Sequence, residues 1–239
     1  MNNTNHKMIK IDFNLLPCNV TKIDLSYQKL TELPDLSRFT HLQELDCSNN
    51  KLTSLPTLNI HLQVLNCCNN RLTSLPTLNK ELQILNCSFN ELTSLPPLNI
   101  HLQNLNCSLN KLTCLPTLNI HLQVINCSYN RLTSIPTLNT KLIKLYCCNN
   151  QLTSLPTLNN DLQELNCAVN DLTSLPPLNN HLQNLNCSYN QLVNLPTLNT
   201  TIYMLNCSYN KLIHIPKIDN TLQHIHFYEN PIYDIINTN

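Results

Sequence analysis

The chain repeats itself every twenty residues from His41 to Asn230, and no insertion interrupts this period. One unit, residues 61–80, reads HLQVLNCCNNRLTSLPTLNK, and its residues define unit positions 1 to 20. An earlier unit, residues 23–36, precedes its successor by 22 residues, so the chain holds eleven units, the last of them incomplete. A fixed period of this length indicates a solenoid, in which each unit stacks on its neighbours.

Each unit predicts a short strand followed by an extended return limb. Apolar residues recur at positions 2, 5, 7, 12, 15 and 18. Over positions 4 to 8 the pattern alternates, so Leu65 and Cys67 are expected to face the core, and Val64 and Cys68 the opposite side. Pro76 disfavours a helix in the limb. We therefore expect a repeat solenoid with a parallel β-sheet on one side, extended or polyproline-like return limbs on the other and little helix.

Stacking is required because one unit cannot stabilise itself. Burying a leucine contributes about 1.5–3 kcal/mol, whereas ordering each backbone residue costs roughly 1–2 kcal/mol. Six burials do not offset twenty ordered residues, but neighbours that cover both sides of each unit reverse the balance. The asparagine that recurs at position 10, from Asn50 to Asn230, is interpreted as structural, since its amide can satisfy backbone groups in the turn.

The pattern LxxLxCxxNxLxxLP resembles the leucine-rich repeat. This resemblance implies a leucine-rich-repeat horseshoe, with the parallel sheet on its concave face and the extended limbs on its convex side. The twenty-residue length and the LTSLPTLN segment are similar to the short bacterial-type class, found in secreted effectors of enteric pathogens that include ubiquitin ligases. The resemblance covers residues 21–230. Those ligases carry a further helical domain with a Cys-x-Asp motif, which occurs nowhere in this sequence. The Asn-, Ile- and Leu-rich composition without glycine is similar to repeat proteins of giant viruses that infect amoebae.

The ends differ from the repeats and are interpreted as caps. We expect an N-terminal cap over residues 1–20, repeats over 21–230 and a C-terminal cap over 231–239. The N-terminal cap includes a short strand at residues 11–13. Near the C-terminus, Phe227 replaces the cysteine of position 7.

Nine of the thirteen cysteines occupy position 7, from Cys47 to Cys207. Neighbouring strands lie about 4.7–4.9 Å apart, which is compatible with disulfides, but a straight column cannot supply the tetrahedron that zinc requires. We interpret these residues as buried, unreactive thiols. Cys68 and Cys148, at position 8, are expected to face outward and to be available for reaction.

Composition narrows the partners and the location. Fourteen basic residues balance fourteen acidic ones, which argues against nucleic acid as a partner. No run of apolar residues is long enough to cross a membrane. Unpaired thiols favour the cytosol, including that of an infected host cell, as do Asn-Cys-Ser sequons within the strands. No cofactor or metal site is expected, and no motif predicts catalysis.

Stacking does not require one residue type at the unit positions that vary. The positions that vary most are position 4, on the sheet, and position 9, at its rim. Tyr146 also interrupts the asparagines of position 6. Together these positions predict a concave binding site with apolar and aromatic spots. Its residues are Val64, Ile84, Phe89, Leu109, Val124, Tyr129, Lys144, Tyr146, Tyr189, Met204 and Tyr209.

The sequence therefore predicts a non-enzymatic module that binds a protein or peptide partner on its concave face. The alternative is a substrate-recognition subunit for a ubiquitin ligase whose catalytic part lies elsewhere. Ubiquitin discharge by the purified chain would indicate catalysis instead.

Overall fold

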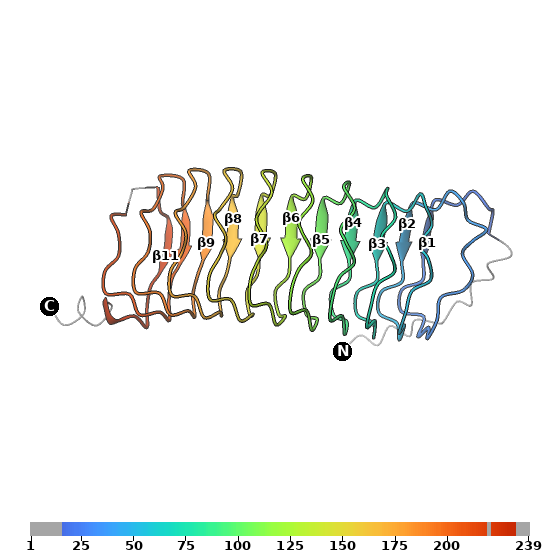
Figure 1. The fold of residues 1–239 in the computed structure, drawn as a ribbon, viewed down its shortest axis with the longest axis horizontal. Helices are drawn as coiled ribbons and strands as arrows, with labels where there is room; N and C mark the ends of the chain where they lie inside the picture. Colours follow the sequence, from blue (N-terminus) through green and yellow to red (C-terminus); the bar gives the residue numbers. More distant parts are fainter. Residues whose placement is uncertain (1–15, 219–220, 233–239) are drawn as a thin grey trace, which may run out of the picture.

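The computed structural model describes residues 16–218 and 221–232, which form one continuous stack of repeats (Figure 1). Eleven three-residue strands make a single parallel sheet in chain order. The strands are β1 (Lys22–Asp24), β2 (Glu44–Asp46), β3 (Val64–Asn66), β4 (Ile84–Asn86), β5 (Asn104–Asn106), β6 (Val124–Asn126), β7 (Lys144–Tyr146), β8 (Glu164–Asn166), β9 (Asn184–Asn186), β10 (Met204–Asn206) and β11 (His224–His226).

Consecutive strands pair in register, so equal unit positions lie side by side on neighbouring rungs. Leu105 of β5, for example, pairs with Leu85 of β4 and Ile125 of β6. Beyond the strands the same ladder continues, because the amide of Cys107 donates to the carbonyl of Asn126 at 2.8 Å. Among the described residues only 231–232 are helical. The predicted solenoid, with its parallel sheet and extended limbs, is confirmed.

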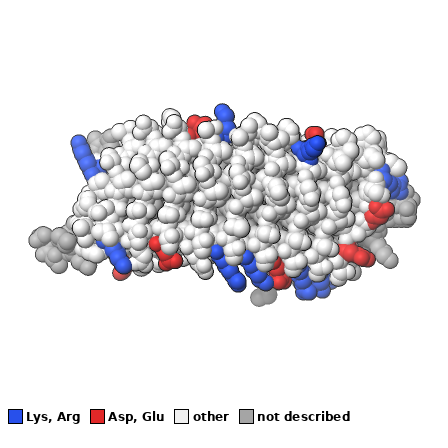
Figure 2. Space-filling view, in the orientation of Figure 1, with Lys and Arg blue, Asp and Glu red and all other residues white. Residues whose placement is uncertain are grey.

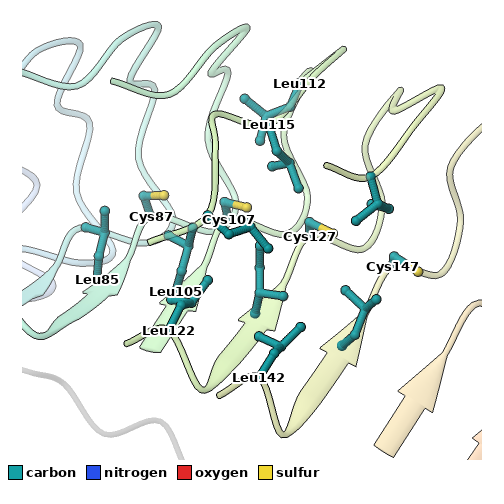
Figure 3. Close-up of a cluster of buried hydrophobic side chains, with 14 of the residues drawn as sticks. Leu85, Cys87, Leu105, Cys107, Leu112, Leu115, Leu122, Cys127, Leu142 and Cys147 are labelled. Carbon is teal, nitrogen blue, oxygen red and sulfur yellow. The ribbon is translucent and has the colours of Figure 1, made fainter. Parts of the chain in front are cut away.

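The core is a set of parallel columns that run the length of the stack. Figure 3 shows the part of these columns around Cys87, Cys107 and Cys127. The column at position 2 from Leu42 to Ile202, the leucines at position 12 from Leu52 to Leu212 and the cysteines at position 7 are completely or almost completely buried, whereas Leu222 and Ile232 of the last unit are half-buried. Positions 15 and 18 are buried in some units and half-buried in others, because they lie in the return limb. In the longer first unit, the fully buried Phe39 fills the space that the shorter units do not have.

The asparagine at position 10 joins each rung to the preceding one. The Nδ2 group of Asn90 donates to the carbonyls of Cys67 and Cys87, at 3.0 and 3.1 Å, while its Oδ1 accepts from the amide of Leu72 at 2.9 Å. The same bonds recur along the stack, which confirms the structural interpretation of this column.

A second asparagine column, at position 19, performs a similar function on the opposite side of the unit. Asn119 donates to the carbonyls of Asn99 and Leu102, at 2.8 and 2.9 Å, and accepts from the amide of His121 at 2.8 Å. This asparagine recurs at position 19 along the sequence, so its period could have predicted the bridging function. The sequence prediction did not include it.

The cysteines of position 7 are buried and carry free thiols, as expected. Burial raises the pKa of the Cys107 and Cys167 thiols to about 12. The expectation for position 8 is wrong, because this position turns inward after the strand and its serines are buried. Cys68 and Cys148 are therefore half-buried, whereas Cys18 and Cys114 are the exposed cysteines.

The strands end sooner than predicted, at position 6 and not at position 8. The left-handed turn at position 9 explains this, since it bends the chain away from the sheet. Phe227 packs against the last part of the core, and Leu16 and Val20 against the first. The strand expected at residues 11–13 and most of both predicted caps lie outside the described residues.

Candidate functional site

The eleven predicted site residues lie along two lines, and none of them is buried. Val64, Ile84, Val124, Lys144, Tyr146 and Met204 belong to strands, at positions 4 and 6, whose side chains alternate with the buried position 5. We call this outward side of the sheet the sheet face. The other five residues occupy position 9, just beyond the strands.

Position 9 has left-handed backbone geometry in every repeat. Its φ angles lie between 53° and 58° from Asn49 to Glu229, although the chain contains no glycine to adopt them without strain. Asparagine tolerates this region best among the other residues, and a β-branched residue there is an outlier. The structure uses asparagine at Asn49, Asn69 and Asn149.

In the twenty-residue units, from Asn49 to Glu229, six apolar side chains occupy this strained position instead of asparagine or glycine. We call them the turn stripe: Phe89, Leu109, Tyr129, Val169, Tyr189 and Tyr209. Five of them are exposed, including Tyr129 at 50% and Phe89 at 56%, and Leu109 is half-buried. These side chains are not buried in the core, and the left-handed backbone of the turn disfavours them. Neither core packing nor turn formation therefore explains their presence. Sequence reasoning omitted Val169, which belongs to the same line.

Aromatic rings gather at the C-terminal end of the turn stripe. Tyr189 and Tyr209 stack with ring centroids 4.1 Å apart, and Tyr228 meets Tyr209 edge-on at 5.3 Å. A hydrogen bond with Tyr189 raises the pKa of Tyr209. His226 lies edge-on to Tyr228 at 6.3 Å. Sequence reasoning missed Tyr228 as a site residue because it occupies position 8, which other units fill with small residues.

Two predicted residues of the sheet face are linked through Glu164. The ammonium group of Lys144 lies 2.8 Å from Oε1 of Glu164, and the hydroxyl of Tyr146 donates to Oε2 at 2.5 Å. Burial raises the pKa of Tyr146 to about 12, and the bond to Glu164 adds to this shift. Burial alone would raise the pKa of Glu164, but hydrogen bonds from Lys144 and Tyr146 outweigh it and lower that pKa.

A shallow pocket of about 270 Å³ opens on the sheet face beside this cluster. Tyr146 stands at one end, Met204 and His226 stand at the other, and asparagines of β8 to β10 line the space between them. A larger cavity of about 620 Å³ lies between the limbs of the first two units, lined by leucines and prolines such as Leu33 and Pro56, and no predicted site residue borders it.

The opposite edge of the stack carries further exposed apolar residues. Ile60, Ile100 and Ile120, at position 20, are 70%, 53% and 60% exposed. They precede His61, His101 and His121 in the turn that enters the strand. Figure 2 shows a largely uncharged face, with lysine, arginine, aspartate and glutamate mostly along the two long edges.

In residues 16–218 and 221–232, no three histidine, cysteine or acidic side chains come together as a metal site. No helix in this part of the chain has the length and apolar character needed to span a membrane.

The fold and this surface define the chain as a leucine-rich β-solenoid. The family profile described as Leucine Rich repeats (2 copies) matches residues 18–59. A search of curated proteins found no match.

Among solved structures, the chain is similar to YopM from Yersinia pestis, a leucine-rich effector, with 32% identity and a TM-score of 0.84 over 88% of this chain and 61% of that one. A Shigella effector LRR domain is 31% identical, with a TM-score of 0.60 over 65% of this chain and 72% of that one. The functional domain of InlJ from Listeria monocytogenes, which includes a cysteine ladder, is 27% identical, with a TM-score of 0.64 over 88% of this chain and 58% of that one.

The chain therefore belongs to the leucine-rich repeat family, and bacterial effector proteins are among its structural neighbours. It spans less than two thirds of the YopM chains it matches. Leucine-rich repeat domains generally serve as scaffolds for protein interactions.

Proposed function

We propose that this chain is a non-enzymatic binding module that holds a protein or peptide partner on its sheet face and turn stripe. The observation that carries the proposal is the turn stripe itself. Its exposed apolar side chains occupy left-handed positions where asparagine would cost less, as it does at Asn149. A residue that is both strained and exposed is best explained by a function at the surface.

The chemistry of the turn stripe favours a protein over other partners. Tyrosine supplies a large contact area with little loss of conformational entropy and is enriched at binding hot spots. The charges of the chain balance, so no field attracts nucleic acid. We expect partner side chains to pack against the stacked rings of Tyr189 and Tyr209.

We also propose that the protein acts in the cytosol, including that of an infected host cell. All thirteen cysteines are free, and nine form a buried column.

The test replaces four residues of the turn stripe by the residue that the fold itself uses at this position. The variant is Phe89→Asn, Tyr129→Asn, Tyr189→Asn and Tyr209→Asn. We expect it to weaken binding by on the order of tenfold or more, while its stability rises because backbone strain is relieved. The probe is a peptide selected from a random library on the immobilised wild-type chain, and its affinity is measured by titration calorimetry.

The matched control removes equally exposed apolar surface from the opposite edge, with Ile60→Asn, Ile100→Asn and Ile120→Asn. It should bind the selected peptide as the wild type does. The proposal is wrong if no library sequence enriches on the chain, or if the control loses affinity and the stripe variant keeps it.

A further inference from the structure

The repeats are themselves repeated in a block of four units. Several features that occur only twice are separated by eighty residues: the Cys-Cys pairs at 67–68 and 147–148, the Pro-Pro pairs at 96–97 and 176–177, Asn-Leu-Asn at 104–106 and 184–186, and Ile-Pro at 135–136 and 215–216. Residues 61–140 and 141–220 are therefore two copies of one four-rung block. The position-6 asparagines of β4 to β6 and the position-9 residues of the first copy therefore have counterparts in the second, whereas Asn66 and Ile84 correspond to Tyr146 and Glu164.

The asparagines of position 6 present hydrogen-bond donors on the sheet face. In Asn106, Oδ1 accepts from the amide and the hydroxyl of Ser108, at 3.2 and 2.8 Å. A backbone amide can only donate, so the carbonyl side of the asparagine must face it and the Nδ2 group must point away. Asn186 has the same arrangement with Ser188.

Six of these amide groups have no acceptor among the described residues: Asn86, Asn106, Asn126, Asn166, Asn186 and Asn206. None of their Nδ2 atoms is a buried, unpaired atom, so water reaches them. Asn66 shows what such a group binds when an acceptor is near, because it donates to Oδ2 of Asp46 at 2.8 Å.

The free amides and the turn stripe occur on the same rungs. Each of the six asparagines shares its unit with one apolar residue of the stripe, as Asn106 does with Leu109 and Asn186 with Tyr189. On β2, β3, β7 and β11, where no free asparagine amide occupies position 6, position 9 is Asn or Glu. Only the irregular first unit departs from this rule, with Tyr27 beside Asp24.

These rungs form two segments of equal length. Segment one comprises β4 to β6, with Asn86, Asn106, Asn126, Phe89, Leu109 and Tyr129. Segment two comprises β8 to β10, with Asn166, Asn186, Asn206, Val169, Tyr189 and Tyr209. They are four rungs apart, or about 19 Å at the usual strand spacing, and β7 separates them with Lys144 and Tyr146.

We propose that segments one and two are two equivalent sites, each of which binds an extended, uncharged stretch of polypeptide. Backbone carbonyls of the partner accept from the asparagine amides, and its apolar side chains pack on the turn stripe. This inference rests on the proposed function and specifies its partner: a protein that offers two such stretches and gains affinity from binding both.

The chemistry excludes the main alternatives. Segment one has no charged side chain at positions 4, 6 or 9, and Glu164, the charged side chain that segment two has at these positions, already pairs with Lys144 at 2.8 Å. A charged ligand would therefore lose its hydration without finding a free counter-charge. A second copy of the chain would place donors opposite donors. The pocket of about 270 Å³ lies over segment two, between the asparagines of β8 to β10, and is large enough for one partner side chain.

The test replaces the central donor of each segment by an acceptor of the same shape. Asn106→Asp and Asn186→Asp keep the oxygen that caps position 8, since Asp24 and Asp46 make the same bond to Ser26 and Ser48 at 2.9 Å. The matched control, Asn149→Asp, adds the same charge between the segments at an exposed residue that tolerates left-handed geometry.

The probe is a peptide selected from a random library on the wild-type chain, titrated by calorimetry. We expect two peptides per wild-type chain and per Asn149→Asp chain. Each single variant should bind one peptide unchanged and the other about tenfold more weakly, and the double variant should lose both strong sites. One peptide per wild-type chain, or binding insensitive to both substitutions, overturns the two-site proposal. If such binding still needs the turn stripe, the proposed function survives, whereas failure of any peptide to bind overturns both.

Discussion

At the scale of single residues, the surface is shaped by backbone geometry that the sequence does not display directly. Every repeat needs a left-handed residue at position 9, and the chain supplies it without glycine. That choice costs stability wherever the residue is β-branched or aromatic. The chain can use a better-suited residue at this turn, as it does at Asn49, Asn69 and Asn149. An apolar residue at position 9 therefore marks a rung on which the function of the surface outweighs the stability of the turn.

Val169 is the clearest case, because a valine with a φ angle of 56° is an outlier. We expect Val169→Asn to raise the free energy of unfolding by about 1 kcal/mol, as measured by urea denaturation followed by circular dichroism. The reverse change at the equivalent turn of the preceding rung, Asn149→Val, should lower stability by a similar amount. Equal stability of all three proteins would show that position 9 carries no strain.

The structural role of a residue could be predicted from the sequence wherever the stack requires the same kind of side chain on every rung. The buried thiols of position 7 and the bridging amides of position 10 followed from periodicity alone. Position 8 was misassigned, because strict alternation was extended beyond the point at which the strand ends. The left-handed turn that ends it depends on backbone angles, and a chain without glycine gives no compositional sign of them.

At the scale of the elements, three-residue strands are too short to hold the sheet together by themselves, and side-chain amides complete the ladder. Asn190 is 5% exposed and joins two rungs: its Nδ2 donates to the carbonyls of Cys167 and Cys187, and its Oδ1 accepts from the amide of Leu172. The element that folds is therefore the pair of adjacent rungs and not the single strand.

Asn190→Ala leaves these three buried backbone groups without their partner. Since each unpaired buried group costs about 1–3 kcal/mol, we expect the free energy of unfolding to fall by at least about 3 kcal/mol in urea denaturation. Asn180→Ala, at an exposed turn in the preceding unit, should change it by less than about 0.5 kcal/mol. Similar effects of the two substitutions would contradict the bridging function.

Pairs across rungs could have been predicted from the same register. Lys144 and Glu164 are directly paired residues of β7 and β8, so their contact follows from the period of twenty residues. The cavity between the first two units has another origin, since the spacing of 22 residues breaks the match between their limbs. The sequence displays that irregularity, but not the space that it opens.

At the scale of the whole molecule, the stack concentrates one ionisable group in a single column. Nine thiols lie side by side in the core, from Cys47 to Cys207, and burial raises the pKa of each above its ordinary value. An unfolded chain would ionise the same thiols near pH 8.5. The protonation of the column is therefore coupled to folding of the entire solenoid.

This coupling predicts a steep loss of stability in alkali. The folded-state pKa of each column thiol is raised, so its contribution is fully present below about pH 8.5 and is lost as the pH rises towards about 12, the value for Cys107. Above pH 8.5 each thiol lowers the free energy of unfolding by about 1.4 kcal/mol per pH unit. Nine together exceed, within about one to two pH units, the 5–15 kcal/mol typical of a folded domain.

We expect the chain to unfold in reducing buffer between about pH 9 and pH 10.5. Circular dichroism across a pH series, with urea denaturation at each pH, measures this. Cys127→Ala should reduce the pH slope of the unfolding free energy by about one proton. Constant stability from pH 8 to pH 10.5 would show that the thiol column is not what limits the stability of the folded solenoid in alkali.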